Sequence, residues 1–344
     1  MEIVIPDPSL VVLIGISGSG KSTFARTHFL PTQVLSSDTC RGMVADDEND
    51  QSATGDAFAI LHLIAEKRLA AGRLTAVDAT NVQSEARKPL IALARRYHLF
   101  PVAVVLNLPQ RLCADRNESR PDRNFGPHVL RQQRSQLRQS LGGLQREGFR
   151  HVYVLDSPEA VAEAAVRRQP LWTNRGAERG PFDIIGDVHG CFDELCDLLT
   201  RLGYQVGLEA DAEGRLLYPV AAPPGRKVVF LGDLVDRGPR SPDVLRLAMG
   251  MVAAGTALCV PGNHDDRLRR KLEGREVRIS YGLAETLAQL AGETPAFLEQ
   301  IRAFLDGLVS HYLLDEGRLV VAHAGMRQDL QGRSSGAVRS FALY

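Results

Sequence analysis

The sequence lacks the features that mark several classes of protein. Its five cysteines form no C-x-x-C pair, so it predicts neither a disulfide framework nor a cysteine-based zinc site, and we expect a reducing, cytoplasmic location. No apolar run approaches the roughly 18 residues of a membrane span, and the run 10–16 follows an acidic start unlike that of a signal peptide. Aromatic residues make up only 6% of the chain, so few platforms for stacking nucleic-acid bases are expected. The formal net charge of zero neither supports nor excludes a nucleic-acid partner.

The 344 residues have the composition of a soluble globular protein and suffice for two domains. Strand and helix signals alternate over residues 1–168, which predicts an α/β domain whose parallel sheet carries helices on both faces. Its strands are expected at 11–14, 33–36, 74–78, 101–108 and 151–155, with a helix at 53–71 that stops at Gly72. A polar stretch rich in proline and glycine at 169–181 is interpreted as a linker. A second α/β domain is expected over 182–344, with strands at 182–186, 227–232, 257–261 and 318–323.

A glycine-rich segment follows the first expected strand. Gly15-Ile-Ser-Gly-Ser-Gly-Lys-Ser22 fits the pattern G-x-x-x-x-G-K-[ST], between a strand and a helix. In this setting backbone N–H groups surround phosphate oxygens, Lys21 reaches the β- and γ-phosphates, and Ser22 holds Mg²⁺. The predicted ATP-binding residues are Gly15, Ser17, Gly18, Ser19, Gly20, Lys21, Ser22 and Thr23. The alternative is an ordinary glycine-rich turn.

Carboxylates stand near two further strand ends. Asp38 is expected to end the second strand, with Arg41 three residues later, and could accept a proton from an attacking hydroxyl. The alternative for Asp38 is a helix N-cap. The segment Asp78-Ala-Thr-Asn81 ends the third strand, where it could hold water or a metal ion, or cap the next helix.

Arginines suggest a lid over the phosphates. Arg116 and Arg120 are four residues apart, which places them on one helix face, and Arg123 follows. Guanidinium groups suit a charged phosphoryl transition state, and prolines and glycine at 121–127 interrupt the helix. The alternative for these arginines is a solvated helix face.

Four segments in the second half combine histidine with hard oxygen ligands. They are Gly186-Asp-Val-His-Gly190, Gly232-Asp-Leu-Val-Asp-Arg-Gly238, Gly262-Asn-His-Asp265 and Ala322-His-Ala-Gly325. Each follows an expected strand, so we expect the candidate ligands to share one sheet edge: Asp187, His189, Asp233, Asn263 and His323. This donor set suits a pair of transition-metal ions such as Mn²⁺, bridged by Asp233.

Three neighbours of these ligands are candidates for catalysis. Arg237 can bind a phosphate as a fork, and His264 can protonate a leaving oxygen with Asp236 as its partner. The alternative for every member of the set is a helix cap or a packed polar group, but four such segments in this order make that coincidence improbable.

These motifs resemble known families. G-D-V-H-G, G-D-x-V-D-R-G, G-N-H-D and H-A-G are similar to the calcineurin-type metallophosphoesterases, an α/β sandwich fold, and D-R-G to their phosphoprotein-phosphatase branch. G-I-S-G-S-G-K-S-T, S-S-D-T-C-R and R-N-E-S-R resemble the P-loop polynucleotide kinases. The two in this order resemble the bacterial polynucleotide kinase–phosphatase family of RNA end-healing enzymes.

The resemblance implies roles for individual residues. Lys21 and Ser22 bind ATP and Mg²⁺, Asp38 is the general base toward the 5′-hydroxyl end of RNA or DNA, and Arg41 grips that acceptor. Arg116 and Arg120, with Arg123 beside them, clasp the phosphates of ATP. The second half is implied to remove 2′- or 3′-terminal phosphates, including 2′,3′-cyclic ends, with a pair of Mn²⁺ or similar ions.

The sequence also departs from this pattern. The families carry a further G-H histidine downstream and a ligase-like module, and neither follows His323 here, so the second domain is expected to be incomplete at its C-terminus. We therefore expect ions to bind at Asp187, His189 and Asp233 but weakly at Asp233, Asn263 and His323, with little phosphatase turnover and few partners for residues 338–344. A ligase-like module or an RNA-modifying protein is the expected partner, and a homodimer is left open.

Two other functions stay open. The first is a phosphoprotein or dinucleoside polyphosphate phosphatase fused to a small-molecule P-loop kinase. The second is a regulatory scaffold that senses ATP, although Asp38 argues against it because a sensor needs no base.

Overall fold

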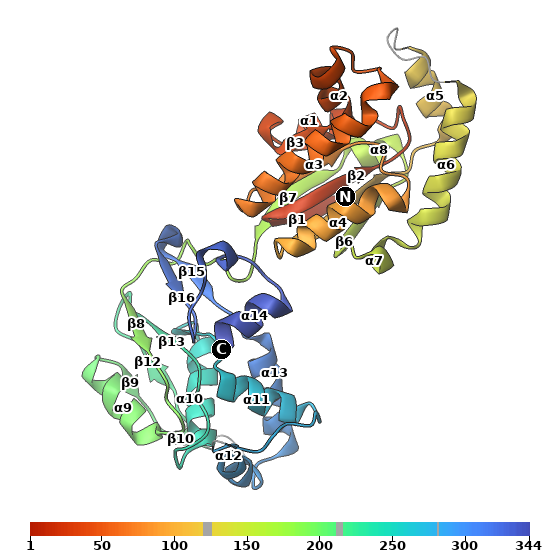
Figure 1. Ribbon diagram of the computed structural model, residues 1–344. Coiled ribbons are helices and arrows are strands. Elements are labelled where there is room, and N and C mark those ends of the chain that lie inside the picture. The colour runs from red at the N-terminus through yellow and green to blue at the C-terminus, as the bar shows by residue number, and fades with distance from the viewer. Residues whose placement is uncertain (120–125, 211–215, 281) are drawn as a thin grey trace. The chain divides into compact units, whose positions relative to one another are not determined.

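The chain divides into two units, Met1–Leu171 and Trp172–Tyr344, in a computed structural model that describes residues 1–119, 126–210, 216–280 and 282–344 (Figure 1). Arg120 and Arg123 lie outside the described residues, so their expected place in a lid stays a prediction. No helix in the described part of the chain combines the length and the apolar character that crossing a membrane requires.

A five-stranded parallel sheet forms the centre of the first unit. Its strands are β3 (Val34–Ser36), β4 (Thr75–Asp78), β2 (Ser9–Ile14), β5 (Phe100–Leu106) and β6 (His151–Leu155), in that spatial order. Every neighbouring pair is parallel, so all carboxyl ends lie at one edge. The predicted parallel sheet is confirmed, and its strands match the predicted ones within a few residues.

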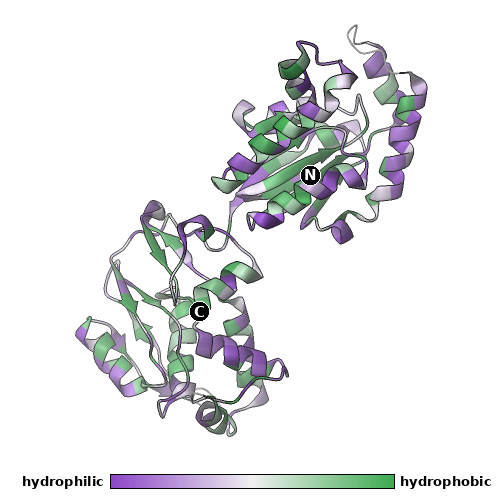
Figure 2. Ribbon diagram, viewed as in Figure 1, coloured by the Kyte–Doolittle hydropathy of each residue, from purple (hydrophilic) through white to green (hydrophobic). Residues whose placement is uncertain are grey.

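Alternating residues of β2 bury opposite faces of this sheet, because successive side chains of a strand point in opposite directions. Val12 and Ile14 pack with apolar residues of several helices, and Val11 and Leu13 pack with those of α1 and of strand β1 (Glu2–Asp7). The longest helices of the first face are α3 (Thr54–Ala70), α4 (Ser84–Arg96) and α6 (Pro127–Leu141), whereas α1 spans Lys21–His28. Helices therefore cover both faces, as predicted, and Figure 2 shows the apolar strands between them.

The remaining elements of the first unit lie around this centre. The helices are α2 (Ser37–Ala45), α5 (Gln110–Glu118), α7 (Leu144–Glu147) and α8 (Pro158–Ala162). A strand that the sequence did not predict, β1 (Glu2–Asp7), pairs in parallel with β7 (Ala165–Pro170). Residues 169–170 of the expected linker thus belong to a strand, and Leu313 bonds to both Thr173 and Arg175, which ties the following residues to the second unit.

The second unit contains a three-stranded parallel sheet in the order β14 (Ala257–Cys259), β13 (Lys227–Phe230), β8 (Phe182–Ile185). Alternating side chains again bury opposite faces. Val228 and Phe230 pack against helices, and Val229 packs against a hairpin of β15 (Tyr312–Leu314) and β16 (Leu319–Val321). This is the α/β sandwich expected from the resemblance.

The helices of the second unit are α9 (Phe192–Arg201), α10 (Ser241–Ala253), α11 (Asn263–Leu272), α12 (Leu283–Leu290), α13 (Pro295–Gly307) and α14 (Gly336–Leu343). Two short antiparallel pairs join β9 (Gln205–Val206) to β12 (Val220–Ala221) and β10 (Glu209–Ala210) to β11 (Leu216–Leu217). The 3₁₀ turns are Pro31–Gln33, Gln51–Ala53, Asp315–Gly317 and Gln328–Leu330.

Two expectations about the second unit are wrong. The strand before His323 is not part of the parallel sheet, because β16 pairs with β15 in antiparallel orientation and with no other strand in the part of the chain that the structure describes. Residues 338–344 do not lack partners: they form most of α14, which buries Val338 and Ala342 completely. Ala342 accepts a hydrogen bond from Ala324 N, and Arg339 donates to Leu308 O, so these residues pack within the unit.

Candidate active sites

The glycine-rich segment of the first unit forms a loop closed around Lys21. Gly18 and Gly20 have φ values of +79° and +93°, a left-handed conformation that favours glycine. A Cβ atom at Gly18 would also lie closer than 3.0 Å to the carbonyl oxygen of Cys113 on α5. The ammonium of Lys21 donates to Gly15 O at 2.9 Å and to Ile16 O at 3.0 Å, which holds its charge inside the loop. This is the geometry of a phosphate cradle at a helix N-terminus.

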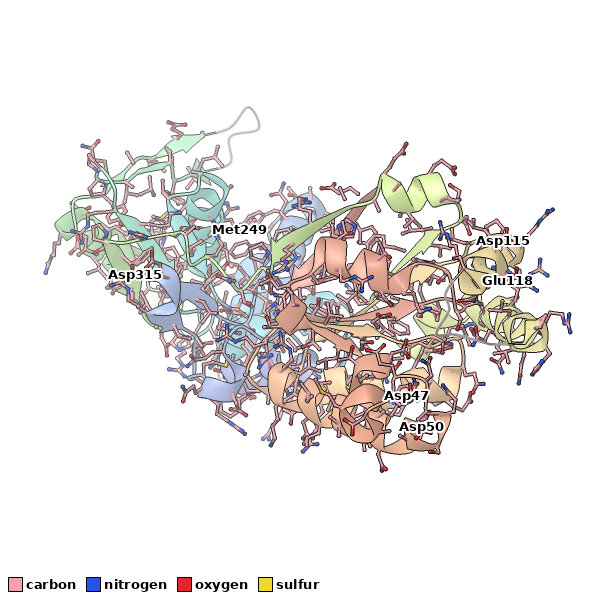
Figure 3. The ribbon with its side chains drawn as sticks, turned by 90° about the horizontal axis from the view of Figure 1, so that it is seen from above. Asp47, Asp50, Asp115, Glu118, Met249 and Asp315 are labelled. Carbon is pink, nitrogen blue, oxygen red and sulfur yellow. The ribbon has the colours of Figure 1, made fainter. Side chains whose placement is uncertain are left out.

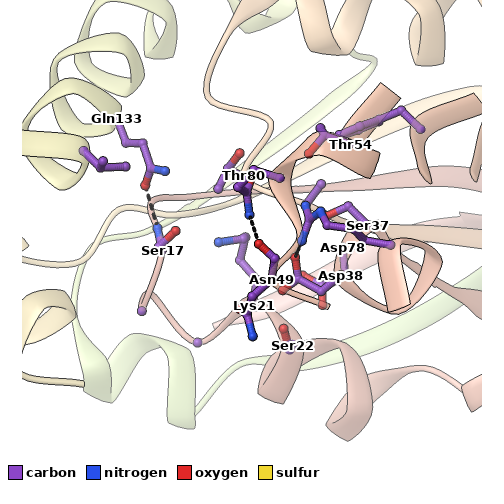
Figure 4. A pocket seen from close by; sticks show the side chains of 17 residues that line it. Ser17, Lys21, Ser22, Ser37, Asp38, Asn49, Thr54, Asp78, Thr80 and Gln133 are labelled. Carbon is purple, nitrogen blue, oxygen red and sulfur yellow. Dashed lines mark hydrogen bonds and ion pairs between the residues drawn. The ribbon is translucent and has the colours of Figure 1, made fainter. Parts of the chain in front are cut away.

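A hollow of about 240 Å³ opens beside this loop (Figure 4). The loop contributes Lys21 and Ser22 to its wall, and α2 contributes Asp38 and Arg41. The complete lining also includes Ser17, Gly18, Gly20, Ser37, Asn49, Gln51, Thr54, Phe58, Asp78, Ala79, Thr80, Val129 and Gln133. The structure therefore brings a cradle for phosphate and a carboxylate to one hollow.

Asp38 lies in the first turn of α2, two residues beyond the end of β3, and not at the end of the strand as expected. The alternative assignment as an N-cap is also wrong, because Ser36 caps α2 by accepting a hydrogen bond from Thr39 N. Asp38 Oδ1 accepts from Arg41 Nη1 at 3.1 Å, and the same guanidinium donates to Glu48 O. The side chain of Asp38 is 26% exposed and that of Arg41 is 8% exposed, so the carboxylate faces the hollow from a fixed position.

The turn after β4 is structural in part. Asp78 is buried and lines the hollow. Its expected role in holding water or a metal ion stays a prediction. Asn81 instead donates from Nδ2 to Leu13 O at 2.9 Å, and Gln83 occupies the N-cap of α4. Capping by either residue is therefore wrong, and Asn81 fastens this turn to the strand that leads into the phosphate loop.

Two contacts to the phosphate loop were not found from the sequence. Gln133 on α6 accepts a hydrogen bond from Ser17 N at 2.9 Å through Oε1, and Thr80 O accepts one from Gly15 N at 3.0 Å. A lone glutamine in a helix and a main-chain carbonyl form no sequence pattern, so no signal was available for either.

A second hollow of about 510 Å³ also borders the loop. Gly18, Ser19, Gly20 and Thr23 line it together with Arg116 on α5. A Cβ atom at Gly20 would lie 3.6 Å from Arg116 Nη1, which places that guanidinium next to the loop. The acidic Asp115 and Glu118 are on the same helix, labelled in Figure 3. Arg116 thus adjoins the loop, and its expected contact with the phosphates of ATP stays a prediction.

In the second unit, two loops meet at Asp233. The backbone N–H groups of Val188 and His189 both donate to Asp233 O, at 3.1 and 2.8 Å. His189 and Asp233 have φ values of +48° and +49°, the left-handed region that non-glycine residues rarely adopt. The surrounding structure therefore holds both candidate ligands in a strained backbone, as is common at functional sites.

The carboxylate of Asp233 is the common centre of two groups of donor atoms. One group joins it to His189 and His264, and the other to Asp187 and His323. Asp233 Oδ2 lies 3.7 Å from His189 Nε2, 3.9 Å from His264 Nε2 and 3.6 Å from His323 Nε2. Asp187 reaches both groups, at 3.7 Å from His189 and 3.9 Å from His323. Asp187, His189, Asp233 and His323 therefore converge although β16 belongs to a separate hairpin, and Asn263 lies beside His323. Asp233 belongs to both groups, and its bridging role stays a prediction.

The hydrogen bonds of two histidines prepare them for a cation. His189 Nδ1 donates to Val235 O and His323 Nδ1 donates to Leu231 O, each at 2.9 Å, so both Nε2 atoms present a lone pair. His189 Nε2 is buried without a hydrogen-bond partner among the described residues. His323 Nε2 lies 3.1 Å from the amide oxygen of Asn263, where two lone pairs face each other. A divalent cation would satisfy these atoms, so the residues fit a metal pair.

His264 and Asp236 form a buried pair beside this centre. His264 Nδ1 and Asp236 Oδ2 are 2.6 Å apart, and the two side chains are 5% and 0% exposed. Arg237 follows with a φ of +67° and is exposed, and it makes no hydrogen bond or ion pair with the residues described. A histidine held by a carboxylate thus lies beside the candidate ligand Asp233, and Arg237 follows Asp236 in the same loop.

Asp265 also belongs to the site. It ends the G-N-H-D segment, but the sequence pattern assigned it no role. It is completely buried, and its two oxygens accept from Leu234 N at 2.9 Å and Gly262 N at 2.8 Å. It therefore joins the loop after β13 to the loop after β14. Burial raises the pKa of Asp265 to about 7, although both backbone donors oppose the rise. An acidic residue in the first turn of a helix was the available signal, since such residues bond back to the N-cap.

Comparisons with known proteins match each unit separately. Residues 10–142 match the AAA domain family, and residues 180–333 match the calcineurin-like phosphoesterase family. The phosphatase half is similar to the bis(5′-nucleosyl)-tetraphosphatase PrpE [asymmetrical] of Halalkalibacterium halodurans, at 40% identity over 47% of this chain and 64% of the relative. The same enzyme of Bacillus subtilis is 39% identical over 47% of this chain and 65% of the relative. The chain thus spans less than two thirds of the length of these relatives.

Among solved structures, the Pnkp1/Rnl/Hen1 RNA repair complex aligns with 75% of this chain and 80% of that chain, at 16% identity and a TM-score of 0.36.

Proposed function

We propose that this chain, which joins a P-loop domain to a calcineurin-like phosphoesterase domain, heals nucleic-acid ends. The first unit would phosphorylate 5′-hydroxyl ends with ATP, and the second would remove 2′- or 3′-terminal phosphates, including 2′,3′-cyclic ends. The observation that carries the proposal is the hollow shared by Lys21, Ser22, Asp38 and Arg41. A nucleotide-binding module without an acceptor needs no carboxylate there.

The residues of this hollow supply the parts of a phosphoryl transfer. The loop and Lys21 hold the β- and γ-phosphates, and Ser22 would hold the Mg²⁺ that neutralises part of their charge. The acceptor oxygen bonds to the γ-phosphorus while the bond from that phosphorus to the β–γ bridging oxygen breaks, and ADP departs. Asp38 takes the proton of the hydroxyl, and Arg41 keeps the carboxylate oriented through the 3.1 Å bond.

The surroundings of the hollow support a polyanionic acceptor. Arg116 adjoins the loop, and Arg131 and Arg138 on α6 are exposed. Arg134 is already engaged, because it donates to Asn107 Oδ1 and Leu108 O, so the charge that is left for a partner is smaller than the sequence suggests. Contacts of this kind go to phosphates and carry no base sequence.

The candidate ligands of the second unit support a metal-dependent phosphatase. The two metal ions would be held by Asp187, His189, Asp233, Asn263 and His323. When bound, they supply Lewis acidity toward phosphate and water. The exposed guanidinium of Arg237 would bind the phosphate as a fork. His264 would give a proton to the leaving oxygen, and Asp236 holds its ring through the 2.6 Å contact.

A second candidate function for this unit has a specific observation behind it. The curated relatives at 39–40% identity are named as asymmetrical dinucleoside tetraphosphatases, so a dinucleoside tetraphosphate is the alternative substrate. The kinase proposal for the first unit does not depend on which substrate the second unit takes.

The test uses the purified 344-residue chain. We expect transfer of labelled phosphate from ATP to a 5′-hydroxyl oligonucleotide, and loss of terminal phosphate from a 3′-phosphate oligonucleotide in the presence of Mn²⁺. RNA and DNA versions of each, and diadenosine tetraphosphate, are compared in parallel. Labelling of small hydroxyl metabolites but of no oligonucleotide would overturn the kinase assignment. Hydrolysis of the tetraphosphate alone would favour the second candidate.

A further inference from the structure

The buried pair His264–Asp236 is held by a third side chain, Thr286 of α12. Thr286 is completely buried, and its hydroxyl makes two hydrogen bonds with Asp236, besides a longer contact of 3.4 Å with Ser241 Oγ. It donates to Asp236 Oδ1 at 2.7 Å and accepts from Asp236 N at 3.0 Å. The backbone and the carboxylate of Asp236 are therefore fastened to the same oxygen atom, which fixes the side-chain rotamer.

This fixing is needed because Asp236 is in an unfavourable backbone conformation. Its φ is +74°, and that of Arg237 is +67°, so the turn would not keep this shape without support. Asp236 Oδ2 is the oxygen that contacts His264 Nδ1, and Oδ1 is the one that Thr286 occupies. Without the hydroxyl, a fully buried carboxylate oxygen would lose its donor, and the carboxylate could turn away from the histidine.

The other contacts of α12 place this helix against the same turn. Gln289, three residues after Thr286 and so on the same helix face, accepts from Ser241 N at 2.8 Å and donates to Gly238 O at 3.0 Å. A Cβ atom at Gly282, just before α12, would lie closer than 3.0 Å to Arg237 N and to Asp236 Cβ. The helix therefore supports the whole segment 236–241, and Thr286 is the member that reaches the carboxylate.

We infer that Thr286 is a positioning residue, which orients His264 through Asp236 for proton donation to the leaving oxygen. This inference rests on the proposed phosphatase function for its chemical consequence, but not for its geometry. A hydroxyl is required at this position, because the same oxygen must donate to Asp236 Oδ1 and accept from Asp236 N. Serine can replace it, whereas valine has the same shape but lacks both bonds.

The first test is independent of activity. In proton NMR of the metal-free full chain, the Nδ1 proton of His264 should give a far-downfield signal that disappears in His264→Asn. Thr286→Val should shift or broaden this signal, Thr286→Ser should restore it, and the matched control Thr200→Val on α9 should leave it unchanged. If Thr286→Val does not fold, Thr286→Ala replaces it. A wild-type chain without the signal, or a signal that no hydroxyl-free variant alters, would overturn the inference.

The second test separates proton donation from simple structural loss. An acid matters for a poor leaving group and little for a good one, so the ratio of kcat for a nucleoside 3′-phosphate to kcat for p-nitrophenyl phosphate is compared among the variants with Mn²⁺. Thr286→Val should lower this ratio about tenfold, a loss near the lower limit of what a general acid contributes. Thr286→Ser should restore the wild-type ratio. Equal losses on both substrates would overturn the inference. If the wild type is inactive on both substrates, the proposed phosphatase function is contradicted but the inference about Thr286 is not. The NMR result would then still decide whether Thr286 positions His264.

Discussion

A side chain on Gly262 would collide with the carboxylate of Asp233. A Cβ atom built on its backbone lies closer than 3.0 Å to Oδ1, Cγ and N of Asp233. The loop after β14 can approach the loop after β13 only because this residue is glycine. That approach lets His264 N donate to Asp233 Oδ1 at 2.9 Å and brings Asn263 next to the candidate bridging ligand.

Gly262→Ala should therefore weaken metal binding by at least about tenfold, because the methyl group must displace the Asp233 carboxylate. Isothermal titration with Mn²⁺ measures the effect. Gly292→Ala is the matched control, since a Cβ atom there meets nothing within 4 Å, and it should bind like the wild type. Unchanged binding by Gly262→Ala would show that the two loops do not need this approach.

Asp233→Asn should lower the stoichiometry or the affinity for Mn²⁺ more than a change at any other ligand, because Asp233 belongs to both groups of donor atoms. Bound Mn²⁺ should also raise the Tm of the wild type and not that of the variant. Asp197→Asn is the control, because that side chain is 77% exposed on α9. A variant that still gains the full Tm shift would contradict the bridging role.

Asp38→Asn should lower transfer of phosphate to 5′-hydroxyl oligonucleotides by about 10²–10⁴-fold, the usual contribution of a general base. ATP affinity should change little, because the phosphate loop does not include Asp38. The control is Asp47→Asn, which should keep wild-type rates. Asp47 is labelled in Figure 3 and is exposed on the loop after α2. Near-wild-type turnover in Asp38→Asn would remove the base assignment.

Lys21→Ala should abolish kinase activity and leave any phosphatase activity unchanged. Lys21 bonds within its own loop, and each unit has its own hydrophobic core. Parallel assays of one protein preparation, with circular dichroism to check folding, give the result. Equal loss of both activities in a folded variant would mean that the two units share one site.

His311 predicts a pH dependence of stability. It is completely buried, Gly332 N donates to its Nε2 at 2.9 Å, and Ser310 Oγ lies 2.9 Å from its Nδ1, so the neutral ring is satisfied. Burial lowers its pKa from 6.5 to about 4. Between pH 4 and pH 6.5 the unfolded chain binds more protons at His311 than the folded chain does. The contribution of neutral His311 to the free energy of unfolding is therefore complete above pH 6.5 and is lost as the pH falls toward 4.

The size of this effect is roughly 3 kcal/mol across the window, at about 1.4 kcal/mol for each pKa unit. Urea unfolding between these pH values, with a chelator present, should show a steeper dependence for the wild type than for His311→Gln. Identical slopes would show that His311 does not contribute.

The sequence by itself determined the parallel sheet of the first unit, the phosphate loop and the candidate metal ligands that follow the parallel strands β8, β13 and β14. These features depend on local order along the chain: an apolar strand, then a glycine-rich or acidic turn, then a helix. The carboxyl ends of parallel strands share an edge, so residues that follow such strands meet there whatever the details of packing. This is why Lys21 and Asp38 face one hollow although Asp38 lies on α2 and not on β3.

Only the tertiary structure decided which polar groups are structural and which face the sites. Asn81 bonds to Leu13 O, Gln133 reaches Ser17 N across 116 positions, and Thr286 reaches Asp236 across 50. Such contacts join elements that are far apart in the chain, and a single Asn, Gln or Thr has no periodic signal. The same holds for His323, which meets Asn263 because the β15–β16 hairpin packs apolar residues against β13, a contact between buried side chains and not a strand pairing.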